Sequence, residues 1–142
     1  MAQTLGPQCA AFVPPPVAIG FYTLLGGGLS FVAAFIGFET VYAIDPNVDD
    51  VVALRVILGS GGVGYILGAS AVGALAANGV GGSPSRVGLV TLGFATATVV
   101  VAGGVFAFSD NAGATAIAVV SGAAVTSIAA GIAHATAPGP LE

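Results

Sequence analysis

Hydrophobic and polar positions divide this chain into four long apolar stretches separated by short polar breaks. The breaks fall at residues 45–50, 78–86 and 109–111. A helix needs about 20 predominantly apolar residues to cross the roughly 30 Å hydrocarbon core of a bilayer, and each stretch is long enough. The pattern therefore predicts an all-α membrane protein with four transmembrane helices.

Prolines, glycines and carboxylates in the breaks set the ends of the helices. Pro16 closes a run of three prolines, which a helix cannot extend through, and Pro46 pushes Asp45 out of the helical region. Asp49 and Asp50 are suited to the start of the next helix, where carboxylates accept free N–H groups. We expect one transmembrane domain over residues 1–142, with helices at about 17–44, 51–78, 86–108 and 112–137. The short connections predict an up-down-up-down antiparallel bundle.

Composition agrees with this pattern and narrows the function. The 142 residues are 56% hydrophobic and 6% charged, whereas globular domains carry about a quarter charged residues. Two arginines, no lysine and six acids give a net charge of −4. That balance argues against a nucleic-acid partner, which would need clustered cations, and against a polybasic grip on anionic lipid. Acidic side chains without lysine also fit an organism that lives in high salt.

The residues needed for most catalytic and cofactor chemistry are missing. A chain without lysine forms no retinal or pyridoxal Schiff base and no phosphate-loop contact. One histidine and one cysteine give a single chain no usual zinc site, bis-histidine haem site or iron–sulfur cluster. Cys9 lies in a segment that superficially resembles a lipoprotein cleavage site. No positively charged start and apolar core precede it, so we expect no signal peptide and a free thiol. The sequence predicts no catalytic residue, no metal, no cofactor and no enzyme.

Small residues recur at helical spacing on three of the predicted helices. In a bilayer, lipid tails compete for apolar surface, so helices associate where small residues let their backbones approach. These smooth faces indicate close helix packing or self-association. Their members are Gly26, Ser30 and Ala34; Ser60, Gly64 and Gly68; and Ala114, Ala118, Gly122, Thr126 and Ala130.

Two charged residues lie well inside the spans. Glu39 precedes Asp45 by six residues and Arg55 follows Asp50 by five, so both lie about 8 Å inside the same end of a hairpin at 1.5 Å per residue. An isolated charge in a span costs at least about 2.5 kcal/mol, so we expect Glu39 and Arg55 to form an intramembrane ion pair. In the alternative, Glu39 binds a cation or a proton at the mouth of a pathway, and Arg55 tunes its pKa.

The other polar and aromatic positions have an ordinary explanation and a functional one. His134 is suited to the C-terminal end of the last helix, with a proton relay or a ligand as the alternative. The hydroxyls of the last two helices are expected to bond to their own backbone, although they could line a polar path. Phe31, Phe35, Phe38 and Tyr42 form an aromatic stripe that faces lipid or, alternatively, carries a flat ligand such as a quinone or carotenoid.

These observations favour a structural or accessory membrane protein, either a subunit of a larger membrane assembly or an envelope component. The alternative is an oligomeric channel or transporter for a small ion or solute that uses Glu39. We expect the partners to be the lipid bilayer together with further copies of the chain or a larger membrane protein. We expect an integral protein of the cell membrane. Arg86 favours a cytoplasmic connection between the second and third helices, which would place both termini in the cytoplasm, and Arg55 counts against that orientation.

Overall fold

The structure is a computed structural model that describes residues 13–79, 82–109 and 111–136, and every element in that part of the chain is helical. The elements are α1 (Pro15–Ile44), α2 (Asp50–Leu67), the π-helical turn η1 (Gly68–Val72), α3 (Gly73–Gly79), α4 (Pro84–Ser109) and α5 (Ala112–Ala135). Because α2, η1 and α3 form one continuous span, the described residues contain four helices long and apolar enough to cross a membrane.

The predicted all-α architecture of four membrane-spanning helices is therefore confirmed. The bounds of the four spans agree with the predicted ranges to within two residues. The π-helical turn was not predicted. Cys9, Asp110 and the predicted end of the last helix at 137 lie outside the described residues.

The helix ends follow from the residues that the sequence places there. The Asp49 carboxylate accepts hydrogen bonds from the backbone N–H groups of Val51 (2.9 Å) and Val52 (3.3 Å) and so caps α2. The Asn111 side chain caps α5 in the same way, accepting from the N–H of Ala114 at 3.0 Å. These caps satisfy N–H groups that the first turn of a helix leaves without partners.

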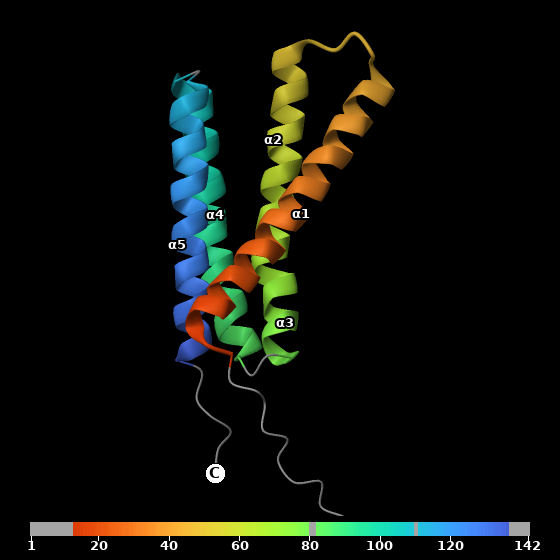
Figure 1. Ribbon diagram of the computed structural model, residues 1–142. Helices are drawn as coiled ribbons and strands as arrows, with labels where there is room; N and C mark the ends of the chain where they lie inside the picture. The colour runs from red at the N-terminus through yellow and green to blue at the C-terminus, as the bar shows by residue number, and fades with distance from the viewer. Residues whose placement is uncertain (1–12, 80–81, 110, 137–142) are drawn as a thin grey trace, which may run out of the picture.

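The four spans form two antiparallel hairpins that meet at one end and diverge at the other (Figure 1). In the first hairpin α1 packs on α2, and in the second α4 packs on α5. At the closed end, α1 begins, α3 ends, α4 begins and α5 ends. At the open end, the connection between α1 and α2 lies apart from the ends of α4 and α5.

Packing at the closed end involves all four spans. A buried cluster there contains Ala18 and Tyr22 of α1, Ala77 of α3, Val87 of α4, and Ala130 and Ala133 of α5. Its helices are held together because α1 crosses the second hairpin at this end, as Figure 1 shows.

Large side chains lie outside and small ones lie inside. Eight of the ten buried hydrophobic residues among those described are alanines, whereas 28 large hydrophobic residues are exposed. A chain in water would bury its large apolar side chains, because their burial drives folding. In a bilayer the surrounding lipid is equally apolar, and helices associate by close backbone contact over small residues. This distribution fits a protein surrounded by lipid.

The first hairpin is held by Gly64 of α2 and Gly68 of η1, which lie directly against the backbone of α1. A Cβ atom built at Gly64 would lie 2.5 Å from the carbonyl oxygen of Leu29, and one at Gly68 would lie 2.6 Å from the carbonyl oxygen of Leu25. The hydroxyl of Ser30 donates to the carbonyl of Gly61 at 2.9 Å across the same contact. Two of the predicted smooth faces are thus used within the chain itself.

The smooth face of α5 is also used within the chain. Gly122 lies against the side chain of Thr98 on α4, and Thr126 and Ala130 are buried. The Thr98 and Thr126 hydroxyls lie 3.4 Å apart between these helices. Small residues therefore join α4 to α5 as they join α1 to α2.

Candidate functional site

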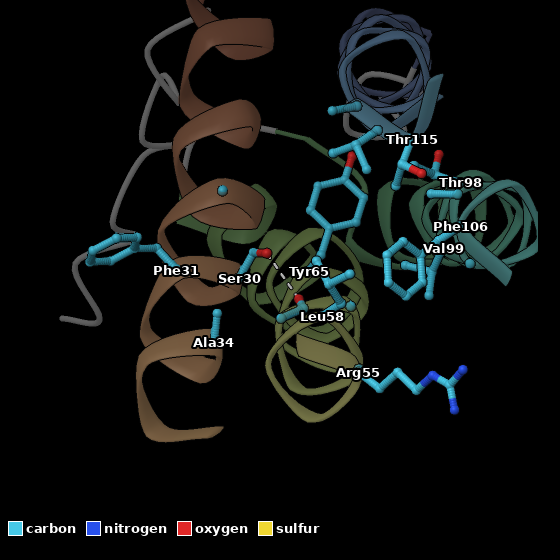
Figure 2. A pocket seen from close by; sticks show the side chains of 18 residues that line it. Ser30, Phe31, Ala34, Arg55, Leu58, Tyr65, Thr98, Val99, Phe106 and Thr115 are labelled. Carbon is cyan, nitrogen blue, oxygen red and sulfur yellow. Dashed lines mark hydrogen bonds between the residues drawn. The ribbon is translucent and has the colours of Figure 1, made fainter. Parts of the chain in front are cut away.

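The divergence of the hairpins leaves a cleft in the open half of the molecule. The cleft has a volume of about 590 Å³ and is lined by residues of α1, α2, α4 and α5. Its walls include Ala34 of α1, Leu58 of α2, Val99 and Phe106 of α4, and Val119 of α5. The chain itself does not fill this space (Figure 2), so the cleft is the main candidate for a binding site.

The serine and threonine hydroxyls around the cleft are used by the backbone. Ser30 donates to Gly61, Thr98 donates to the carbonyl of Phe94 at 2.8 Å, and Thr115 donates to the carbonyl of Asn111 at 3.1 Å. A hydroxyl proton engaged in this way is not offered to a ligand or to water. The cleft therefore presents a largely apolar surface.

Tyr65 closes the inner end of the cleft. Its side chain crosses from α2 toward α5 (Figure 2), and its hydroxyl lies beside Thr126. Its ring also packs on α1, because a Cβ at Gly26 would lie 3.1 Å from it. Tyr65 of α2 thus touches both α1 and α5 at the inner end of the cleft.

Arg55 lies at the outer end of the cleft. It lines the cavity and is exposed, and Figure 2 shows its side chain extending from α2 on the side away from α1. Glu39 is exposed on α1. The structure does not bring the two predicted partners together within one chain, so their ion pair stays a prediction.

His134 belongs to a separate, polar site at the closed end. It lies in the last turn of α5, as expected, but it is only 5% exposed. Its Nδ1 atom lies 3.3 Å from the hydroxyl of Tyr22, which is 3% exposed. Gly82 packs against the same ring, because a Cβ there would lie 2.5 Å from Nδ1. The arrangement is a buried hydrogen bond that joins the first and last helices.

Three further hydroxyls of α4 and α5 follow the ordinary explanation. Thr91 donates to the carbonyl of Val87 at 2.6 Å, Thr126 to that of Gly122 at 2.8 Å, and Ser127 to that of Ala123 at 2.9 Å. Each acceptor lies four residues earlier in the same helix, a common pattern for Ser and Thr in membrane helices. These three side chains donate to the backbone, and the Ser127 hydroxyl also accepts from that of Thr23 at 2.7 Å.

Sequence reasoning missed Tyr22 and Tyr65. Tyr22 meets a partner 112 residues away, and no local pattern reports such a distance. A signal was nevertheless present, since a tyrosine hydroxyl within an apolar span needs a partner. Within the described ranges, no group of three or more His, Cys, Asp or Glu side chains could hold a metal ion.

The four long apolar helices and the apolar outer surface define an integral membrane protein. Comparison with known protein families, with curated proteins and with solved structures gives no match for this chain.

Proposed function

We propose that this protein is a structural or accessory component of a larger membrane assembly, and that it meets a neighbouring chain through the outer face of α1. This face consists of Phe31, Phe35, Phe38 and Glu39. The proposal has its main support in Glu39, a carboxylate within a span that is exposed on the outside of the chain.

A carboxylate in this position favours a protein partner. Glu39 lies five residues before the end of α1, about 8 Å inside the span at 1.5 Å per residue. Charged groups at membrane depth are costly and normally pair or face a wet interior. A cation or a hydrogen-bond donor on a neighbouring chain would remove this cost.

The aromatic residues beside Glu39 extend the same face. Phe31, Phe35 and Phe38 are 74%, 56% and 44% exposed. The smooth faces of α1, α2 and α5 lie inside the chain and are not free for a partner. The outer face of α1 therefore replaces them as the surface proposed for association.

An oligomeric channel or transporter is the second candidate. Glu39 points out of the chain, so it could line a space shared between copies. Under this hypothesis the solute crosses between subunits, because the hydroxyls inside the chain are engaged by their own backbone.

The cellular location and orientation belong to the same proposal. Arg86 lies at the closed end with the start of α1, and its guanidinium donates to the carbonyl of Thr136. A cytoplasmic Arg86 would follow the positive-inside rule, with both termini in the cytoplasm and the open end facing outward. A cell membrane in a high-salt organism fits the acidic composition.

The proposal is tested by the mass of the complex extracted from its own membrane in a mild detergent, with every co-purifying chain identified. The accessory role predicts a stoichiometric larger partner that is lost in Glu39→Gln and retained in Asp50→Asn. Asp50 is the matched control, because it undergoes the same carboxylate-to-amide change at the aqueous start of α2. A homo-oligomer without a partner, together with ion or solute flux that Glu39→Gln abolishes, would favour the channel instead.

A further inference from the structure

The cleft between the hairpins has the depth of one leaflet of a bilayer. Its outer end is marked by Arg55 and its inner end by Tyr65. Ten residues of helix separate them, which is about 15 Å, or half of the ~30 Å hydrocarbon core. Tyr65 also lies at the middle of the span that runs from Asp50 to Gly79. The cleft thus runs from near one membrane surface to near the midplane.

The size of the cleft accommodates a hydrocarbon chain. The cleft has a volume of 590 Å³ along a length of about 15 Å. A single extended hydrocarbon chain is thinner than an α-helix with its side chains, which is at least 10 Å across, so the cleft has room for one.

The chemistry of the walls fits the same occupant. The lining residues are chiefly Gly, Ala, Val, Leu and Phe, and the nearby hydroxyls of Ser30, Thr98 and Thr115 are bonded to backbone carbonyls. Water in the cleft would find few hydrogen-bond partners, whereas a hydrocarbon chain needs no hydrogen bonds. Lipid from the surrounding leaflet can reach the space from the open end.

Arg55 specifies the polar end of the ligand. It lies at the mouth of the cleft and five residues inside the start of α2, with its guanidinium directed away from α1. A long arginine side chain in this position extends toward the membrane surface, where lipid phosphates lie. The planar guanidinium binds phosphate with two parallel hydrogen bonds.

We infer that the cleft binds a phospholipid from the leaflet at the open end, with hydrocarbon chain between the two hairpins and the phosphate at Arg55. A bound lipid would fill the divergence of the hairpins and hold them at a fixed distance. This inference requires only insertion in a membrane and is independent of the accessory role proposed for the outer face of α1.

A variant that fills the cleft tests whether the hydrocarbon chain of a lipid binds there. Gly103 lines the cleft on α4, and nothing lies within 4 Å of a Cβ built there, so Gly103→Leu starts a side chain in open space beside the proposed lipid. Gly93→Leu is the matched control, because Gly93 is on the same helix with equal room and does not line the cleft. Gly59→Leu makes the same change from the wall formed by α2.

The measurement is native mass spectrometry of protein released from vesicles that contain equal amounts of phosphatidylglycerol and phosphatidylcholine. We expect a retained phospholipid on the natural chain and on Gly93→Leu, and its loss in Gly103→Leu and Gly59→Leu. Equal retention by all four proteins, or no retained lipid on any of them, would overturn the inference. The helical circular dichroism signal of each variant shows whether it folds. If one filling variant fails to fold, lipid retention by the other filling variant tests the inference.

A second variant tests the headgroup contact. Arg55→Gln should weaken lipid retention and abolish any preference for the anionic phosphatidylglycerol, whereas Arg55→Lys should keep part of both. Unchanged retention and preference in Arg55→Gln would overturn the assignment of the phosphate to Arg55. If the filling variants instead displace a stoichiometric protein chain in the native extract, the cleft is a protein interface and the lipid inference is wrong.

Discussion

Replacing Gly64 with alanine tests the close contact that holds α1 to α2. The new Cβ atom would lie 2.5 Å from both the Leu29 carbonyl oxygen and the Ala33 Cβ, although real Cβ atoms essentially never approach another atom within 3.0 Å. The two helices must therefore separate by at least 0.5 Å, the difference between these two distances. Overpacking of this kind costs about 1–3 kcal/mol.

Gly59→Ala isolates that cost from the intrinsic preference of alanine for helices. Both changes occur in α2, and alanine is favoured over glycine there by about 0.5–1 kcal/mol. Nothing lies within 4 Å of a Cβ at Gly59, so the control gains this preference without a clash. The difference between the two variants should therefore equal the clash alone, about 1–3 kcal/mol.

Reversible unfolding in mixed micelles, followed by helical circular dichroism, gives the free energy of unfolding of each variant. We expect Gly64→Ala to be less stable than Gly59→Ala by this amount. Equal stabilities would refute the reasoning, since they would mean that the backbones of α1 and α2 are not in contact at Leu29.

Three further predictions concern a cap, a buried pair and a threonine, each checked by the same unfolding measurement. Asp49→Ala removes the side chain that caps α2 and should cost about 1 kcal/mol, whereas Asp50→Ala should cost less; equal losses would contradict the assigned cap. A double-mutant cycle of Tyr22→Phe and His134→Leu should show a coupling of about 0.5–1.5 kcal/mol in the free energy of unfolding. Additive effects of the two changes would rule out the hydrogen bond between these side chains. Thr98→Val should cost less than about 1 kcal/mol, because the hydroxyl bonds to its own helix; abolished solute flux in this variant would instead support a polar path.

The number, length and limits of the spans could be predicted because they depend on local sequence. Apolar length specifies a span, and the Asp45-Pro46 pair and the Asp49 carboxylate specify where one helix ends and the next begins. The spacing of Ser60, Gly64 and Gly68 also identified a contact face, since small residues one turn apart lie on one side of a helix.

The cleft could not be predicted, because it depends on the angle between two hairpins and not on any local pattern. The stripe on α2 shows which residues are small but not that α1 is their partner. Glu39 and Arg55 have matching depth in the sequence, yet helix rotation sends the Arg55 side chain away from α1. The depth of a residue in the membrane follows from counting residues along the helix. The direction of its side chain depends on how the helices pack.

The π-helical turn η1 gives the second span two different neighbours. Before it, α2 packs mainly on α1; after it, α3 packs mainly on α4, with Ala74 beside Gly88. A π turn accommodates one residue more than an α-helical turn, so it rotates every later side chain about the helix axis. Deleting a single residue within Gly68–Val72 would remove this extra residue and restore a regular helix, so the side chains of α3 would stay turned toward α4. Deleting a residue within α3 itself, where no wide turn absorbs the change, would rotate the later side chains by about 100° about the helix axis. This span therefore tolerates a change of length at η1 better than in its α-helical parts.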